Sequence, residues 1–162
     1  MLDDAGPQKH WQKNWPCVTV SPQCKKGKAW SALQLMLLLD HIEKKYKIDR
    51  TRVYVSGISM GGFGTWSCLQ LAPERFTAAA PICGGGKAEG ASKLTGIPIW
   101  NFHGDKDTAV PIGRSKEIVD AIRKAEGGKI IFTIYEGGGH DVWTRTYENQ
   151  LLYDWLFSHG GR

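Results

Sequence analysis

Residues 52–64 read RVYVSGISMGGFG, and this stretch decides the fold. An apolar run of strand type leads into Gly-x-Ser-x-Gly, with Ser59 at its centre, and a helix-compatible run over 65–71 follows. A serine between a strand and a helix is the context of a nucleophile elbow, in which a strained turn exposes the hydroxyl. Gly57 and Gly61 are expected to let strand and helix approach where a Cβ would clash. The stretch therefore predicts that Ser59 is a nucleophile.

The rest of the chain alternates strands and helices around this stretch. The sequence predicts strands over 17–20, 53–56, 76–83, 97–103 and 129–135, and helices over 30–47, 113–126 and 144–158. The helix over 30–47 has a broad apolar surface, which is expected to lie against the sheet; it is made by Leu33, Met36, Leu37 and Leu39. The alternation predicts a doubly wound, mostly parallel α/β sheet in a single domain over residues 1–162.

Length and composition suit one globular domain with a real core, since 41% of the 162 residues are hydrophobic. The longest apolar run, over 35–39, is too short to span a bilayer. The N-terminus carries Asp3 and Asp4 and has no apolar segment of the kind found in secretory signal peptides. We therefore expect a soluble protein, either cytoplasmic or secreted, with no membrane span.

The net charge of +5 comes from the N-terminal third of the chain. Residues 1–52 hold ten Lys and Arg against five acids, whereas residues 53–162 hold eleven of each. Basic residues gather over 44–52, where a helix should end, and cations at that position match the helix dipole. No nucleic-acid-binding motif accompanies them, so no nucleic-acid partner is expected.

The four cysteines show neither Cys-x-x-Cys spacing nor a nearby histidine pattern; they are Cys17, Cys24, Cys68 and Cys83. Zinc sites need such spacing, so we expect free thiols, no metal and no cofactor. A bridge between Cys17 and Cys24 is the alternative.

Asp107 and His140 each follow the end of a predicted strand, as Ser59 does. In open parallel sheets, sites form at the carboxyl ends of the strands. His140 would take the proton of Ser59, and Asp107 would hold the far ring nitrogen of His140. Asp105 shares the loop of Asp107 and is the alternative acid. We prefer Asp107, which precedes Val110-Pro111, and expect Asp105 to make turn or capping hydrogen bonds.

Other aromatic and histidine side chains are weaker candidates for the site. His103 ends a predicted strand beside a glycine and is expected to be a hydrogen-bonded structural residue. Trp143 lies just past His140, where it would either line an acyl pocket or serve as a core or surface aromatic. The remaining histidines fall in a predicted loop, helix and tail; they are His10, His41 and His159.

Three runs carry a family resemblance: GISMGG at 57–62, FHGDKD at 102–107 before Val110-Pro111, and GHDVW at 139–143. Together they resemble the α/β-hydrolase superfamily and, within it, the bacterial phospholipase/carboxylesterase proteins, including predicted peptidases and the feruloyl-esterase-like group. The similarity covers about residues 10–158. It implies that Ser59 is the nucleophile, Asp107 the acid, His140 the base and the Met60 backbone N–H one oxyanion donor.

The chain departs from that family at its N-terminus. In the family, a strand and a His-Gly-type loop precede the region that matches residues 10–24, and this loop supplies the second oxyanion N–H. The resemblance therefore implies an N-terminally short α/β-hydrolase fold that lacks its first strands. The strand expected over 17–20 would then pair directly with 53–56, or another subunit of a homo-oligomer would fill the gap. The chain would be a fragment, a compact variant or an enzyme that depends on assembly.

The resemblance and the three candidate residues indicate a metal-independent, carboxylesterase-type serine hydrolase. Its expected substrates are small-molecule esters with small acyl groups, cleaved through an acyl-enzyme. A peptidase or amidase that uses the same residues is one alternative. A non-catalytic scaffold with a hydrolase-like fold is another.

Overall fold

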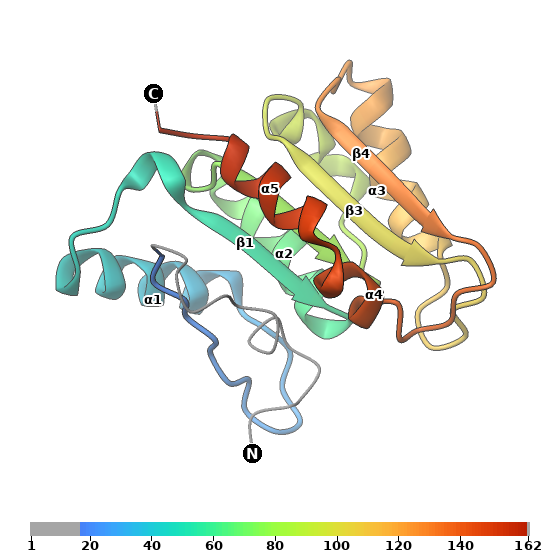
Figure 1. The fold of residues 1–162 in the computed structure, drawn as a ribbon, viewed down its shortest axis with the longest axis horizontal. Helices are drawn as coiled ribbons and strands as arrows, with labels where there is room; N and C mark the ends of the chain where they lie inside the picture. The colour runs from blue at the N-terminus through green and yellow to red at the C-terminus, as the bar shows by residue number, and fades with distance from the viewer. Residues whose placement is uncertain (1–16, 162) are drawn as a thin grey trace.

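The computed structural model describes residues 17–161, which form a parallel sheet with helices on both of its faces (Figure 1). Hydrogen bonds join the strands in the order β1 (Tyr54–Ile58), β2 (Ala78–Ile82), β3 (Ile99–Gly104) and β4 (Ile130–Tyr135). The α-helices are α1 (Ala32–Lys45), α2 (Met60–Leu71), α3 (Gly113–Lys124), α4 (Trp143–Glu148) and α5 (Gln150–Ser158). Short 3-10 helices are η2 (Arg50–Arg52), η3 (Pro73–Arg75) and η4 (Ala88–Leu94). The predicted parallel α/β class is confirmed.

Two apolar layers cover the sheet, one on each face. The side covered by α2, η4 and α3 buries Trp66, Leu69, Ile99 and Ile118. The other side, crossed by α4 and α5 in Figure 1, buries Phe102, Tyr147, Leu152 and Leu156. β2 lies between these layers, so its side chains alternate between them: Ala79 faces the first layer, and Ala78 and Ala80 face the second. The parallel sheet held between these two layers has the carboxyl ends of its four strands at one edge.

The strand predicted over residues 17–20 is wrong. These residues make no ladder in the described part of the chain, and all four are exposed, with Val18 54% and Val20 43% accessible. β1 is therefore an edge strand, paired only with β2. A cavity of about 890 Å³ runs along this edge and is lined by residues 17–20, α1, β1 and α5. Apolar alternation alone does not make a strand when no partner lies within hydrogen-bonding reach.

The helix predicted over 144–158 consists of two helices. Asn149 has an extended backbone (φ −79°, ψ 108°), and its side-chain oxygen accepts a hydrogen bond from the amide of Leu151. This side chain caps α5 and ends α4, because an N-cap asparagine offers the backbone an alternative to a continuous helix. The break lets α4 pack beside the carboxyl ends of the strands while α5 crosses the sheet.

The first helix, α1, packs against α2 rather than against the sheet. Leu33 and Leu37 are 63% and 60% exposed, and Met36 is the buried residue of the helix. The expectation that the whole apolar surface meets the sheet is therefore wrong. The surface runs beside the cavity at the β1 edge, where several of its residues form the wall.

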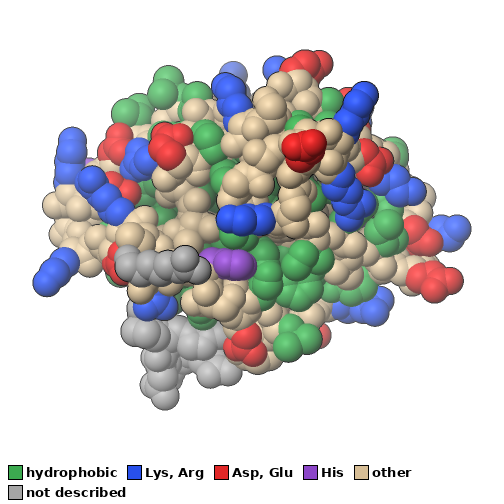
Figure 2. All heavy atoms as spheres, turned by 90° about the horizontal axis from the view of Figure 1, so that it is seen from above, with side chains coloured by type: hydrophobic (Ala, Val, Ile, Leu, Met, Phe, Trp, Pro, Cys, Tyr) green, Lys and Arg blue, Asp and Glu red, His purple; other side chains and the backbone are tan. Residues whose placement is uncertain are grey.

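The surface charges are mixed in sign on the face that Figure 2 shows, where Lys and Arg side chains lie among Asp and Glu. No helix in the described residues 17–161 has the length and apolar character needed to cross a bilayer.

An ion-pair cluster ties α1 to η3. Arg75 Nη2 lies 2.8 Å from Asp40 Oδ1 and 3.1 Å from Glu43 Oε1. Arg50 Nε lies 3.0 Å from Glu43 Oε2. The Glu43 side chain is only 6% exposed, whereas that of Arg50 is 77% exposed. A buried carboxylate such as that of Glu43 is costly unless it is paired, and Arg75 is the less exposed of its two partners. Arg75 should therefore contribute more to the free energy of unfolding than Arg50.

We predict that Arg75→Met lowers the free energy of unfolding by about 1–3 kcal/mol, because it removes charged hydrogen bonds from a buried carboxylate. The matched variant Arg50→Met removes an exposed guanidinium and should cost about 0–1 kcal/mol. Urea unfolding followed by circular dichroism measures both. Equal losses in the two variants would contradict the assigned importance of Arg75.

Candidate active site

Ser59 lies in a strained turn between β1 and α2. Its backbone has φ 51° and ψ −115°, a conformation that residues with a side chain rarely adopt. The turn is held on both sides: the Ser59 amide donates to the Ile82 carbonyl (2.9 Å), and the Ser59 carbonyl accepts from the Phe63 amide (3.0 Å). Such strain persists only where the surroundings over-determine it, and the predicted elbow geometry is present.

Two glycines allow the close approach at this turn. A Cβ on Gly57 would overlap the Gly61 carbonyl, and a Cβ on Gly62 would overlap the Ile82 carbonyl of the neighbouring strand. The sequence led us to assign the second role to Gly61, but a Cβ there would meet nothing within 4 Å. The contact that excludes a side chain is one residue further on, because α2 begins at Met60 and turns Gly62 toward β2.

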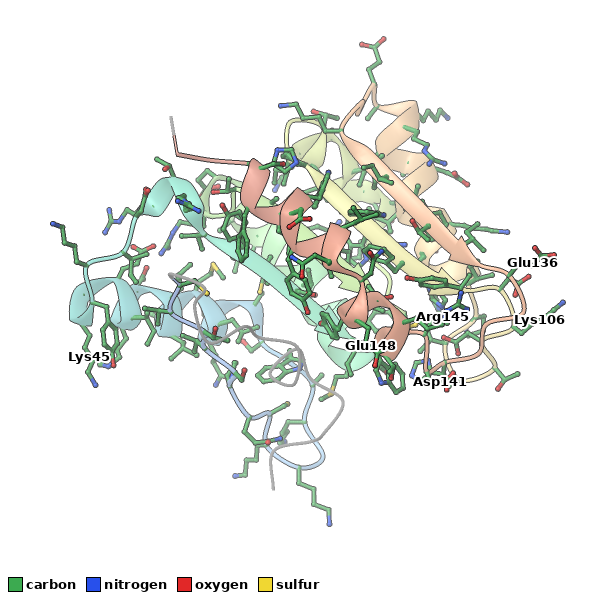
Figure 3. All side chains as sticks on the ribbon, in the orientation of Figure 1. Lys45, Lys106, Glu136, Asp141, Arg145 and Glu148 are labelled. Carbon is green, nitrogen blue, oxygen red and sulfur yellow. The ribbon has the colours of Figure 1, made fainter. Side chains whose placement is uncertain are left out.

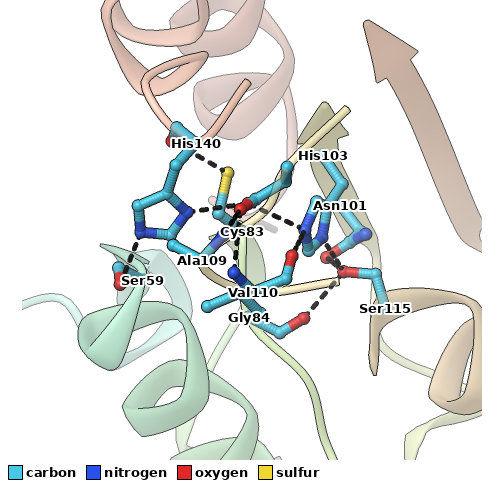
Figure 4. A network of polar contacts seen from close by, with 10 residues as sticks. Ser59, Cys83, Gly84, Asn101, His103, Ala109, Val110, Ser115 and His140 are labelled. Atoms are coloured by element: carbon cyan, nitrogen blue, oxygen red, sulfur yellow. Dashed lines mark hydrogen bonds and ion pairs between the residues drawn. The ribbon is translucent and has the colours of Figure 1, made fainter. Parts of the chain in front are cut away.

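Three side chains from separate connections are hydrogen bonded in series (Figure 4). His140 Nε2 lies 2.9 Å from Ser59 Oγ, and His140 Nδ1 lies 2.7 Å from Asp107 Oδ2. Ser59 follows β1, Asp107 follows β3 and His140 follows β4, so the parallel sheet brings all three to one edge. The structure thus places the three predicted residues side by side.

The Asp107 carboxylate is buried and well supplied with donors. The residue is 7% exposed, and Oδ1 accepts hydrogen bonds from the amides of Ala109 (2.9 Å) and Val110 (2.8 Å). Burial alone would raise the pKa of Asp107. The hydrogen bonds from His140 and from the two amides outweigh it and hold that pKa below its ordinary value. Asp107 is therefore ionised at neutral pH.

Asp105, the alternative acid, does not contact His140. Its backbone amide donates to the Tyr135 carbonyl (3.2 Å), but its Oδ1 is buried without a hydrogen-bond partner among the described residues. The expected turn or capping bonds to this carboxylate oxygen are absent in that part of the chain. The preference for Asp107 as the partner of His140 agrees with the geometry.

Cys83 is a neighbour of the site that the sequence did not suggest. It follows β2, has a positive φ of 49° and is fully buried, and its Sγ donates to the His140 carbonyl at 3.5 Å. Burial raises the pKa of the Cys83 thiol to about 12, with a further contribution from the charge of Asp107. A neutral thiol here packs under the histidine loop. Its place at the end of a predicted strand, the edge where Ser59, Asp107 and His140 also lie, is the sequence signal that could have drawn attention to it.

Cys83, His103 and Asp107 place donor atoms within 4.8 Å of one another, the spacing of a metal site. The donor set does not fit a metal, because the Asp107 oxygens already accept three N–H groups, the His103 Nε2–H is bonded to the Val110 carbonyl and the Cys83 thiol keeps its proton. This cluster is best described as packing around the acid.

Met60 and Trp143 flank the hydrogen-bonded series. Met60 is the first residue of α2, so its amide N–H has no partner within the helix and lies next to Ser59. The Trp143 ring meets the His140 ring edge to face, with centroids 5.2 Å apart and an interplanar angle of 88°. Trp143 thus contacts the imidazole directly, as the first residue of α4.

The loops around the site carry exposed charges of both signs. Figure 3 shows Lys106, Glu136, Asp141 and Arg145 gathered at the end of the sheet toward which β3 and β4 point. Arg145 stacks on Tyr135, with its guanidinium carbon 4.6 Å from the ring centroid. These four residues form a charged rim at this end of the sheet.

The cysteines are free thiols, as expected. Cys17 is exposed, and Cys24 donates from Sγ to the Lys28 carbonyl at 3.2 Å. No bridge joins them. Burial raises the pKa of the Cys68 thiol to about 11.

We predict that Asp107→Asn lowers the free energy of unfolding by about 1–3 kcal/mol near pH 7, because an amide nitrogen would replace an acceptor that faces N–H donors. The folded pKa of Asp107 is depressed, so the stability it contributes is present above the unfolded pKa of about 3.9. It is lost as the pH falls through the folded pKa.

Urea unfolding of the parent and the variant from neutral pH down to about pH 3 measures this difference. The control Asp105→Asn changes a carboxylate on the same loop whose Oδ1 accepts no hydrogen bond, and it should cause no such loss. A difference for Asp107→Asn that stays constant across the whole range would refute the assignment of an ionised, hydrogen-bonded Asp107.

Comparison with known proteins finds a matching family model and a similar solved structure. The model of the prolyl oligopeptidase family matches residues 24–101. The crystal structure of a thermostable esterase is similar with a TM-score of 0.82 and 36% identity, over 86% of this chain and 43% of the esterase.

Two curated relatives are each 41% identical over part of the chain. A bifunctional acetylxylan esterase/xylanase from Neocallimastix patriciarum matches 71 residues, which are 43% of this chain and 10% of that protein. A poly(3-hydroxyalkanoate) depolymerase from Paucimonas lemoignei matches 54 residues, which are 33% of this chain and 13% of that protein. The chain therefore spans less than half the length of each of these proteins.

Proposed function

We propose that this chain, whose fold and sequence are similar to those of α/β-hydrolase esterases, is a serine hydrolase that cleaves carboxylic esters through an acyl-enzyme. The observation that carries the proposal is the hydrogen-bonded series Ser59, His140 and Asp107 at the carboxyl edge of the sheet. Ser59 is the nucleophile, His140 the base and Asp107 the acid.

The proton positions follow from the partners of His140. An ionised carboxylate only accepts hydrogen bonds, so His140 Nδ1 carries a proton and donates it to Asp107. His140 Nε2 then has a free electron pair that faces the hydroxyl of Ser59. This is the tautomer that a general base needs in order to take the Ser59 proton during attack. Asp107 stabilises the imidazolium that forms.

The reaction proceeds in two halves. Ser59 Oγ attacks the ester carbonyl carbon, its proton moves to His140 Nε2, and the negative charge develops on the carbonyl oxygen. His140 then gives the proton to the leaving alcohol, which departs and leaves an acyl-Ser59 ester. In the second half, water attacks the acyl carbon while His140 Nε2 takes its proton; His140 then returns this proton to Ser59 Oγ as the bond to the acyl group breaks, which releases the acid and restores the enzyme.

The Met60 amide is one donor to the developing oxyanion. It is the first N–H of α2, adjacent to Ser59, and it lies at the positive end of the helix. A second donor from another segment would add to it, and each such donor is worth about 10²- to 10³-fold in rate.

Small acyl groups are the proposed substrates. The acetylxylan esterase relative is named for a reaction on acetyl esters, and Trp143 beside His140 would limit the space for the acyl group. The charged rim made by Lys106, Glu136, Asp141 and Arg145 favours a polar alcohol portion over a long aliphatic one.

A peptidase activity is the second candidate, because the matching family model is that of prolyl oligopeptidases. The same serine, histidine and aspartate would cleave an amide by the same steps. Turnover of acyl-peptide p-nitroanilides at rates comparable to those of esters would favour this candidate over an esterase.

We predict that the chain hydrolyses p-nitrophenyl acetate faster than longer p-nitrophenyl esters, and that Ser59→Ala lowers kcat at least about 10³-fold, because the nucleophile is lost. Release of p-nitrophenol, followed by absorbance, measures both. Ser67→Ala is the matched control, since Ser67 is an exposed serine of the same helix, α2, and its loss should leave turnover unchanged.

A folded parent without turnover of any ester or anilide would contradict the proposed enzyme and favour a non-catalytic scaffold. Equal activity of the parent and Ser59→Ala would instead contradict the choice of nucleophile. Circular dichroism of each protein establishes that it is folded.

A further inference from the structure

We propose that His103 is a positioning residue for Asp107, and that it acts by holding the Val110 carbonyl with its Nε2–H while its ring lies against the Asp107 carboxylate. The effect on catalysis rests on the proposed function; the hydrogen-bond geometry does not.

His103 occupies a fully buried position at the end of β3. It has no exposed surface, and both ring nitrogens have partners. Nε2 lies 2.8 Å from the Val110 carbonyl oxygen and 3.2 Å from Asp107 Oδ2. Nδ1 lies 2.8 Å from Ser115 Oγ. Figure 4 shows the His103 ring on the opposite side of this network from His140.

The partners of Nε2 determine where the proton sits. A carbonyl oxygen and an ionised carboxylate oxygen both only accept hydrogen bonds. The Val110 carbonyl therefore requires a donor, so His103 Nε2 carries a proton and donates it to Val110, while Nε2 lies 3.2 Å from Asp107 Oδ2. The ring thereby links the middle of the loop after β3, at Asp107, with its later part, at Val110.

The other side of the ring is anchored to two further elements. Ser115, in the first turn of α3, is fully buried, and its hydroxyl oxygen lies 2.8 Å from both His103 Nδ1 and the Gly84 carbonyl oxygen, so its one proton can bond either of these acceptors. Gly84 lies in the connection after β2. One imidazole thus ties β3, α3 and, through Ser115, the connection after β2, so the ring cannot rotate without breaking these bonds.

His103 supports Asp107 through Val110. Oδ1 accepts the amides of Ala109 and Val110, Oδ2 accepts the N–H of His140, and His103 Nε2 holds the Val110 carbonyl while it lies 3.2 Å from Oδ2. Without the His103 N–H, the Val110 carbonyl would lose its ring partner, and Val110 would hold Oδ1 less firmly. The carboxylate could then turn away from His140, which would misplace the base relative to Ser59.

If His103 positions Asp107, replacing it should change kcat and leave KM unchanged. His103 has no exposed surface and therefore does not touch the substrate, so KM should be unchanged when it is replaced. A misplaced acid weakens the support of the imidazolium that forms in the transition state, so kcat should fall.

A pair of variants separates the two ring nitrogens. In His103→Gln, the side-chain amide nitrogen reaches the place of Nε2, so it can donate to the Val110 carbonyl beside Asp107. In His103→Asn, the amide reaches only the place of Nδ1 and keeps the contact with Ser115. We expect kcat of His103→Gln within about tenfold of the parent and kcat of His103→Asn lower by a further factor of about 10², the size typical of a misplaced catalytic group.

Two measurements test this expectation. The first is kcat of each variant, corrected for the fraction of protein that a fluorophosphonate labels. Ile122→Val, in the apolar layer under α3, is the control for lost stability and should keep the parent kcat. Equal losses of kcat in the Gln and Asn variants, or a changed KM with unchanged kcat, would overturn the proposal.

The second measurement does not depend on turnover. The low-field proton signal of His140 Nδ1–H, observed by NMR, should persist in His103→Gln and shift or disappear in His103→Asn. An unaltered signal in His103→Asn would overturn the proposal even if the parent hydrolysed no ester. A parent without turnover but with the expected NMR pattern would instead refute the esterase assignment and support the positioning role.

Discussion

The hydrogen bonds to the Asp107 carboxylate are the interaction on which the site depends. Three N–H groups donate to its two oxygens, from its own loop and from the loop after β4, and His103 at the end of β3 lies 3.2 Å from Oδ2. A buried carboxylate that lacked these donors would be costly and would bind a proton. With them, its pKa is held below the ordinary value and the charge faces His140. The carboxylate thus fixes how the loops after β3 and β4 lie relative to each other at this edge of the sheet.

The serine turn imposes a second constraint. A positive φ at a residue with a side chain costs of order 1–3 kcal/mol and persists where the fold holds it. Here the Ile82 carbonyl binds the Ser59 amide, and Gly57 and Gly62 let α2 lie close to β1 and β2. Because β2 is buried on both faces, its position is well determined by the two apolar layers. Packing far from the hydroxyl therefore sets the direction in which Ser59 points.

The sequence predicted most of this arrangement because the signals were local. Strand-type runs that end in glycine-rich loops placed Ser59, Asp107 and His140 at the same edge, and a parallel sheet needs no further information to bring them together. The errors arose where tertiary packing decides. The apolar residues of α1 face α2 and a cavity, residues 17–20 find no partner strand, and Asn149 interrupts a helix by capping the next one. The contact at Gly62 and the link from His103 to Asp107 depend on distances between segments, which periodicity does not encode.

Covalent labelling shows whether Ser59 is a nucleophile activated by His140. The folded chain is treated with a fluorophosphonate, digested and mapped by mass spectrometry, with Ser59→Ala treated in parallel. We expect a single adduct on the peptide that contains Ser59, formed by the parent and absent from the variant. A folded parent that remains unlabelled, or that carries its adduct on another residue, would show that Ser59 is not the activated nucleophile.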